Sequence, residues 1–287
     1  MIRNLPIGLI ALLLSCSVGA AELNGTLQRI AETGEFRIGY VPDAPPMSFH
    51  DGDGDPVGYS IALCRHVAAA AKEATGLEEL AISYVPLVSP EDRISAVENG
   101  SVDIECGAST VTLARRERVD FSLLTFITGA AVLSRTGSSI NSIEDLSGKT
   151  VAVIKGTTTD NELRKFVTNN DYKIALRIIA THDEGMKLLQ ASKVDGYASD
   201  RTMLVGQLFR AADRSQLTIT RDVFSFEPYA LMLQRGDTDF RLLVDRALAS
   251  LYRGARIRRL YHDWFGRYGE PMTPVLEALY EFQAVAE

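Results

Sequence analysis

The residues from 100 to 122 include a set of groups suited to holding an anion. An apolar run ends at Cys106 and Gly107, a polar turn follows over 108–110, and Arg115 comes five residues later. Backbone amides, a hydroxyl and a guanidinium around one point suit a carboxylate, because a guanidinium donates two parallel hydrogen bonds. The alternative is that residues 115–118, Arg-Arg-Glu-Arg, form a solvated run of charges. These residues alone leave both interpretations open.

A second anion site is predicted at Gly156-Thr157-Thr158-Thr159. This segment follows a predicted strand and begins a predicted helix, so free amides and hydroxyls are available there. The alternative is an ordinary helix cap formed by one of the threonines. Asp200 ends another predicted strand, where its carboxylate can accept an ammonium group or serve as a turn or capping residue. A carboxylate site and an ammonium site together describe an α-amino acid.

Common catalytic and metal-binding signatures are absent from the sequence. There is no nucleophile elbow, phosphate-binding P-loop, His-Glu-x-x-His or Gly-x-Gly-x-x-Gly. Of the four histidines, His182 and His262 lie far apart in the sequence, and no cysteine lies near a second cysteine or a paired histidine. We therefore expect no metal site and no cofactor.

Short β-branched runs alternate with amphipathic stretches, a pattern typical of an α/β fold. The predicted strands cover 36–41, 81–85, 102–106, 151–154 and 194–199. The predicted helices cover 59–72, 92–98, 159–166, 186–191 and 239–252, and 51–56 is a predicted hairpin turn. Two segments, 123–132 and 226–233, have the character of crossings between two lobes.

The amino terminus has the layout of a secretory signal peptide. Arg3 precedes the apolar run 7–14, and small residues follow at Ser15 and 19–21. Cleavage after Ala20 or Ala21 makes 1–21 the signal peptide and predicts a protein that works in the periplasm. The alternative is a lipoprotein acylated at Cys16.

The composition of the mature chain bears on its partners and on its cysteines. After cleavage the chain keeps 29 basic and 37 acidic residues, a net charge of −8. Nucleic-acid binding calls for a basic face, so this acidic balance argues against it. Cys64 and Cys106 remain, and an even count in an oxidising compartment permits either a disulfide or two free thiols.

The chain resembles the family 3 periplasmic amino-acid-binding proteins, most closely their glutamate/aspartate-binding branch. The resemblance runs from Thr26 to about Tyr268. Its most specific part is 99–122, with Glu-Cys-Gly, Thr110, Arg115 and Asp-Phe-Ser in place. Supporting parts are Gly58-Tyr59-Ser60, 141–149, Lys155-Gly-Thr-Thr and Trp264-Phe265.

This resemblance implies an α/β, two-lobed periplasmic binding protein fold of type II, whose lobes are joined by two hinge strands and close over a ligand. It places lobe 1 at 22–127 plus 229–287 and lobe 2 at 128–228. It also implies a monomer without catalytic activity that captures an L-amino acid and delivers it to an ABC permease. The amino acid expected is Glu or Asp, or the amide Gln or Asn.

The resemblance also assigns roles to residues that read the amino-acid core. Arg115 would hold the α-carboxylate, helped by Thr110 and by Thr157 or Thr158. Asp200 would accept from the α-ammonium, together with the backbone carbonyl of Ala108. The family usually has Ser or Gly at 108, so only the backbone role transfers.

The ligand side chain would be read by Arg93 and His182. Val41 departs from the family pattern, since acidic-amino-acid binders tend to carry Arg at this position and cationic-amino-acid binders Asp. The aromatic platform of basic binders is also missing, with Ala44 and Pro90 in its place. Arg93, having no acidic partner, would then repel a cationic ligand.

Two other functions stay open. Some proteins of this fold are cyclohexadienyl dehydratases, which need an acid aimed at a leaving group, and others are sensory ligand-binding modules. Within the first lobe, the helix carrying Cys64 should pack on the strand ending at Cys106, which predicts a disulfide between them.

Overall fold

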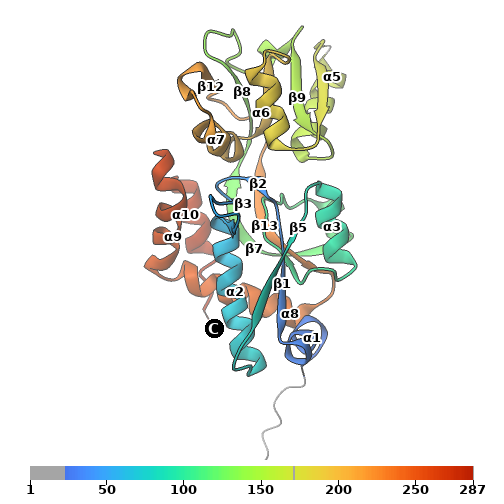
Figure 1. Ribbon diagram of the computed structural model, residues 1–287, viewed down its shortest axis with the longest axis vertical. Coiled ribbons are helices and arrows are strands. Elements are labelled where there is room, and N and C mark those ends of the chain that lie inside the picture. The colour runs from blue at the N-terminus through green and yellow to red at the C-terminus, as the bar shows by residue number, and fades with distance from the viewer. Residues whose placement is uncertain (1–22, 171, 287) are drawn as a thin grey trace, which may run out of the picture.

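The computed structural model describes residues 23–170 and 172–286. Within this part of the chain, two five-stranded sheets form the centres of two lobes, stacked along the long axis of the molecule (Figure 1). The predicted signal peptide, residues 1–21 with Arg3 and Cys16, lies outside the described residues. No helix in the described part is long and apolar enough to cross a membrane.

The larger lobe is built on a sheet with the strand order β5-β1-β6-β13-β7. These strands are β1 (Glu35–Tyr40), β5 (Ala81–Pro86), β6 (Ile104–Glu105), β7 (Val119–Thr128) and β13 (Glu227–Gln234). β1 runs parallel to β5 and β6, whereas β13 is antiparallel to β6 and β7. Its helices are α1 (Gly25–Thr33), α2 (Tyr59–Thr75), α3 (Pro90–Glu98), α4 (Leu113–Arg116), α8 (Thr238–Tyr252), α9 (Ala255–Phe265) and α10 (Pro274–Phe282).

A small antiparallel sheet lies at the edge of the larger lobe that faces the other lobe (Figure 1). Its strands are β2 (Asp43–Ala44), β3 (Ser48–His50) and β4 (Pro56–Val57). The turn between β3 and β4 covers the predicted hairpin turn at 51–56 and is exposed. This small sheet brings Asp43 to the boundary between the lobes.

The smaller lobe is built on a sheet with the strand order β10-β9-β11-β8-β12. Its strands are β8 (Ala130–Arg135), β9 (Thr150–Ile154), β10 (Ala175–Ile179), β11 (Gly196–Asp200) and β12 (Leu217–Ile219), and its helices are α5 (Thr158–Asn170), α6 (His182–Gln190) and α7 (Arg201–Arg210). β9, β10 and β11 are parallel, so their carboxyl ends lie at one edge. Each is followed by a helix, and the first turns of α5, α6 and α7 therefore gather at that edge.

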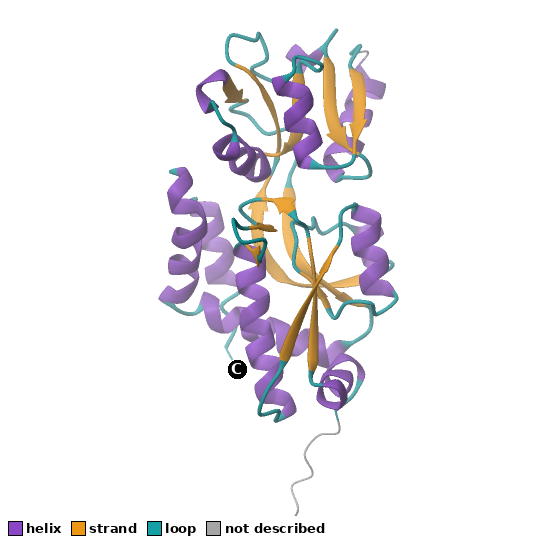
Figure 2. Ribbon diagram, in the orientation of Figure 1, coloured by secondary structure: helices purple, strands orange, loops and turns teal. Residues whose placement is uncertain are grey.

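Two strands connect the lobes. β7 ends at Thr128 and β8 begins at Ala130, and the chain returns through β13, which begins at Glu227. β7 and β13 pair antiparallel from Glu227 opposite Thr128 to Gln234 opposite Val119. Figure 2 shows this pair of strands as the link between the two bodies. The segments 123–132 and 226–233, predicted as crossings, correspond to them.

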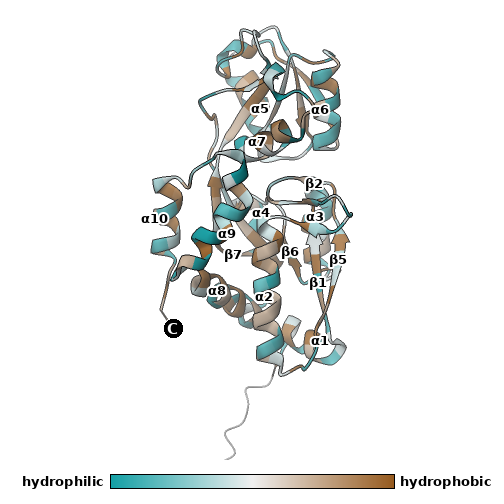
Figure 3. Ribbon diagram, turned by 60° about the vertical axis from the view of Figure 1, so that its left-hand side comes forward, coloured by the Kyte–Doolittle hydropathy of each residue, from teal (hydrophilic) through white to brown (hydrophobic). Residues whose placement is uncertain are grey.

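Apolar side chains pack on both faces of each sheet, as expected of strands covered by helices on either side. In Figure 3 the central strands are mostly hydrophobic, whereas helices such as α2 and α9 alternate between the two colours around their turns. The largest cluster joins α2 to the sheet of the larger lobe, with Tyr59, Phe36 and Phe240 fully buried.

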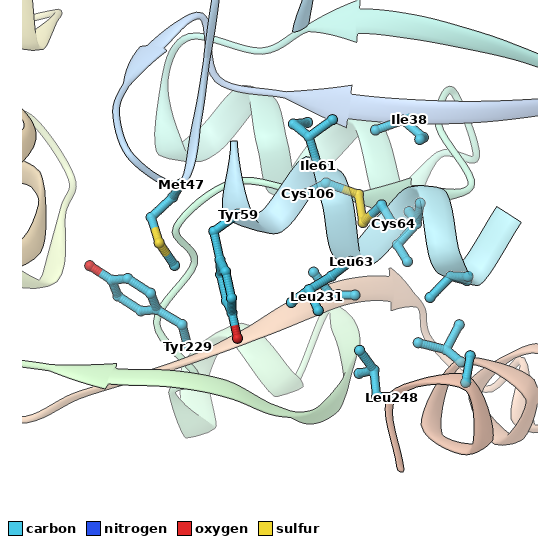
Figure 4. Packing of buried hydrophobic residues seen from close by; sticks show 14 of the residues in the cluster. Ile38, Met47, Tyr59, Ile61, Leu63, Cys64, Cys106, Tyr229, Leu231 and Leu248 are labelled. Carbon is cyan, nitrogen blue, oxygen red and sulfur yellow. A yellow bond between two sulfur atoms is a disulfide. The ribbon is translucent and has the colours of Figure 1, made fainter. Parts of the chain in front are cut away.

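The predicted disulfide is confirmed. Cys64 on α2 and Cys106, just after β6, are bonded with their Cα atoms 6.3 Å apart, and both are fully buried (Figure 4). The bond fixes α2 to the sheet beneath it. It lies entirely within the larger lobe.

Most predicted elements are present, with shifted ends. The strand expected at 102–106 is reduced to β6, two residues long. The helix expected from 92 begins at Pro90, because Ser89 and Asp92 form a reciprocal capping box. The helix expected at 186–191 begins at His182, where Thr181 accepts from the backbone N–H of Glu184. The pattern Thr-x-x-Glu at 181–184 is a local signal that gives the correct start.

Candidate functional site

A pocket of about 50 Å³ lies between the lobes, at the helix starts of the smaller lobe. It is lined by Val41, Asp43, Ala44, Val88, Pro90, Arg93 and Ala108 from the larger lobe and by Ile154, Thr157, Thr159, Ala180, His182, Ser199, Asp200 and Met203 from the smaller. Six of the nine predicted ligand-binding residues are therefore in its wall. Arg115, Thr110 and Thr158 are not part of the lining.

Arg115 is held by α4 in a partly buried position. Thr112 caps this short helix by accepting from the Arg115 backbone N–H, and Nη1 of Arg115 donates to the Thr110 carbonyl at 2.7 Å. Burial, aided by the charge of Arg93, lowers the pKa of Arg115 to about 10, so the guanidinium stays protonated at neutral pH. Arg116, the next residue, is exposed. The exposure of Arg116 fits a solvated charge, whereas Arg115 is partly buried.

The two threonines predicted to assist Arg115 share one partner. Thr110 and Thr158 each donate to Oε2 of Glu227 at 2.7 Å, and their own hydroxyls are 3.5 Å apart. Glu227 begins hinge strand β13 and is only 1% exposed. One oxygen of the hinge therefore binds a hydroxyl from each lobe. No pattern in the sequence singled out Glu227.

Thr157 serves as the helix cap that was the alternative interpretation of this segment. Its hydroxyl donates to the Ile154 carbonyl at 2.9 Å and accepts from the Asp160 N–H at 3.1 Å. Thr157 also lines the pocket, together with Thr159. The start of α5 thus supplies both a cap and part of the pocket wall.

Asp200 ends β11 as predicted and is buried. Its Oδ1 accepts from the Thr159 hydroxyl at 3.1 Å, and its Oδ2 accepts from the Tyr229 hydroxyl. Burial, and after it the charge of the nearby Glu227 carboxylate, raises the pKa of Asp200 to about 6. Tyr229 lies on β13, so the hinge also holds this carboxylate.

His182 is a buried residue at the first position of α6. Its Nδ1 shares a hydrogen bond of 2.5 Å with the Tyr197 hydroxyl, and burial lowers its pKa. Its backbone N–H donates to Oδ2 of Asp43 at 2.8 Å, across the boundary between the lobes. Gln207 of α7 makes a second crossing, donating from Nε2 to the Asp43 carbonyl at 2.7 Å.

The expectation that Arg93 has no acidic partner is wrong. Nη1 of Arg93 lies 3.9 Å from Oε1 of Glu105, and it donates to the Ser109 hydroxyl at 3.3 Å. Ser109 in turn donates to Oε2 of Glu105 at 2.8 Å. Glu105 is fully buried, and the burial raises its pKa although Arg93 opposes the shift. Arg93 and Glu105 neighbour each other because α3 packs beside β6.

Two polar atoms of this pair have no hydrogen-bond partner among the described residues. They are Nε of Arg93 and Oε1 of Glu105, both buried. A Cβ atom added at Gly107 would lie 2.2 Å from that Glu105 oxygen and 2.9 Å from Val41. Gly107 is therefore required where the chain passes over the Glu105 carboxylate.

Among the described residues, no group of three or more His, Cys, Asp or Glu side chains is placed to hold an ion. The pocket wall contains the guanidinium of Arg93, the carboxyl groups of Asp43 and Asp200, and hydroxyls from the smaller lobe. These groups suit a small zwitterion.

The model of one protein family, the bacterial extracellular solute-binding proteins of family 3, matches residues 36–267. The chain belongs to this family. As a family 3 solute-binding protein, it has the two-lobed fold of type II periplasmic binding proteins, as its sequence predicted.

Similar proteins support the same assignment. An L-glutamate/L-aspartate-binding protein of Pseudomonas aeruginosa is 35% identical over 94% of this chain and 88% of its own. A glutamate/aspartate import solute-binding protein of Salmonella typhimurium is 30% identical over 91% of this chain and 86% of its own. An ancestral amino-acid-binding protein, described as a precursor of cyclohexadienyl dehydratase, superposes with a TM-score of 0.73 at 26% identity, covering 84% of this chain and all of that structure.

Proposed function

We propose that this solute-binding protein captures one L-amino acid, with an acidic side chain or its amide, between its lobes and delivers it to an ABC permease. The observation that supports this most is that Arg115 of the larger lobe and Asp200 of the smaller lobe are near enough to interact electrostatically. Burial lowers the pKa of Arg115, and the carboxyl group of Asp200 is among those that oppose this shift. A guanidinium and a carboxylate so placed fit the two charges of an α-amino acid.

In this proposal, Arg115 holds the α-carboxylate, with Thr110, Thr157 or Thr158 as further donors. Asp200 and the Ala108 carbonyl accept from the α-ammonium. Arg93 and His182 face the side chain, over Val41. The relatives named for glutamate and aspartate support this ligand class.

The remaining expectations belong to the same proposal. Lobe 1 comprises 22–127 plus 229–287, and lobe 2 comprises 128–228. The protein is secreted to the periplasm after removal of 1–21, works as a monomer and needs no cofactor. It catalyses no reaction, a proposal supported by the two similar proteins above, which are both named as binding proteins.

Binding of the twenty amino acids to ligand-stripped protein, measured by calorimetry, tests the proposal. Glu, Asp, Gln or Asn should give the tightest complex. Turnover of prephenate or arogenate, with none of the twenty bound, would favour the dehydratase alternative.

Replacing Arg115 by Ala should lower the affinity for every amino acid by a factor of about a hundred or more. Charge-assisted hydrogen bonds contribute about 1.5–3 kcal/mol each, and a guanidinium makes two of them to a carboxylate. The matched control is Arg116→Ala, because Arg116 lies on the same short helix as Arg115. Its exposed guanidinium lies over the Phe121 ring. A folded Arg115→Ala protein that binds as tightly as Arg116→Ala would rule out this site.

A further inference from the structure

Asp43 contributes a carboxyl group to the pocket wall, and none of the ligand contacts proposed above involves it. Its Oδ2 accepts from the backbone N–H groups of His182 and Asp183, at 2.8 and 3.4 Å. Asp43 also lines the pocket, beside Arg93 and His182. These three residues form what we call the side-chain end of the pocket. An inference about it rests on the proposed function, which assigns this end to the ligand's side chain.

The charges at the side-chain end do not favour an added anion. Among the described residues that line the pocket, Arg93 is the one that carries a guanidinium. Oε1 of Glu105 lies 3.9 Å from Nη1 of Arg93. His182 contributes no positive charge at neutral pH, because burial lowers its pKa. Asp183, the residue after His182, forms an ion pair at the surface, with its Oδ1 3.4 Å from Nη1 of Arg210. A second carboxylate, from a Glu or Asp ligand, would therefore meet Asp43 without a full compensating charge.

The hydrogen-bonding groups at the side-chain end also suit an amide better than a carboxylate. Arg93 Nε is a buried donor that has no partner within the described part of the chain, so it can donate to a ligand oxygen. The oxygens of the Asp43 carboxylate only accept hydrogen bonds. A carboxamide has one acceptor oxygen and an NH₂ group that donates two hydrogen bonds, so it can satisfy both residues. A carboxylate has acceptors alone and can satisfy only Arg93.

We propose that Asp43 determines side-chain specificity and makes the pocket select the amides Gln and Asn over the acids Glu and Asp. The acidic group acts by its charge and by its lack of a donor. Its second task, accepting from the start of α6, needs only an oxygen. These two tasks are separable by the isosteric change Asp43→Asn, since Asn also accepts at helix starts.

The test is the ratio of dissociation constants for Glu and Gln, and for Asp and Asn, measured by calorimetry at pH 7.5. In the unaltered protein the amides should bind at least about tenfold more tightly than the acids. Asp43→Asn should reduce that ratio by about tenfold or invert it. Asp51→Asn is the matched control, because Asp51 also accepts from backbone amides but lies in the exposed hairpin turn. It should leave the ratio unchanged.

The ratio separates specificity from a merely structural effect. If Asp43→Asn only loosened the contact between the lobes, acids and amides would weaken equally and the ratio would stay the same, which would overturn the inference. Tighter binding of Glu or Asp by the unaltered protein would overturn it as well, while leaving the proposed function intact. Binding of no amino acid at all would instead overturn the proposed function, and this inference with it.

Discussion

Arg115 and Arg116 are neighbours in the sequence, yet their surroundings differ completely. Arg115 donates to the Thr110 carbonyl and is influenced by the carboxylates of the pocket region, whereas Arg116 is exposed over the Phe121 ring. Part of the difference comes from Asp200 and Glu227, two carboxyl groups far along the chain that act on Arg115. Asp200 shows the same dependence, because its partner Tyr229 lies on the hinge strand.

Affinity should depend on pH through Asp200. Its pKa is raised to about 6 by burial, so lowering the pH through 6 protonates it in the ligand-free protein. A neutral Asp200 offers no charge to the ligand's ammonium group, and binding then requires loss of the proton. The dissociation constant should be constant above about pH 7 and rise by up to about tenfold per pH unit below 6.

Calorimetry from pH 5 to 8 measures this effect, and Asp200→Asn is its control. The variant should bind more weakly at every pH and lose the part of the pH dependence that Asp200 causes. An equally steep pH dependence in Asp200→Asn would assign it to another group, such as Glu105.

At the scale of elements, α7 both follows Asp200 and contacts the larger lobe. Gly206 on this helix faces the turn after β2, where a Cβ atom at 206 would lie only 2.0 Å from the Pro45 carbonyl oxygen. Gln207, the next residue, donates to the Asp43 carbonyl. Because Gly206 has no side chain, this turn of α7 can lie against the Pro45 backbone, and the two lobes can approach each other there.

Gly206→Ala should weaken ligand binding by about tenfold or more without unfolding the protein. The added methyl group would collide with the Pro45 backbone where the two lobes meet, whereas Ala is favoured over Gly inside a helix by about 1 kcal/mol. The affinity should thus fall, while the thermal stability should rise or stay unchanged. Calorimetry and thermal melts measure both. Gly52→Ala, in an exposed turn with nothing within 4 Å of the added atom, is the control and should bind normally.

At the scale of the whole molecule, the two lobes are joined by β7 and β13 alone among the strands described, and the disulfide does not cross between them. Stability and closure therefore depend on different features. Cys64 and Cys106 stabilise the larger lobe, and the hinge governs how the lobes meet.

Replacing Cys64 and Cys106 together by Ala should lower stability but not affinity. The bond closes a loop with a sequence separation of 42 residues, for which chain-entropy arguments give a cost of about 4 kcal/mol on removal. The melting temperature should fall, while the dissociation constant at 25 °C stays within a factor of about three. A much larger loss of affinity in fully folded protein would mean that the bond also positions the ligand site.

The sequence by itself determined the α/β architecture, the hinge segments, the cysteine pair and Arg115 and Asp200 as candidate site residues. These depend on local periodicity, on turn and capping residues, or on a motif whose members lie within 23 residues of each other. The late start predicted for α6 was an avoidable error, since Thr181 and Glu184 carry the capping pattern.

Only the tertiary structure revealed Asp43, Glu105, Glu227 and Tyr229. Asp43 and His182 are 139 residues apart in the sequence, and Thr110 and Glu227 are 117 apart. The charge balance of a pocket depends on separations of 3 to 4 Å between such groups, and no local pattern encodes them. Arg93 illustrates the consequence: its sequence context predicts an unopposed charge, and the packing of α3 beside β6 places Glu105 next to it.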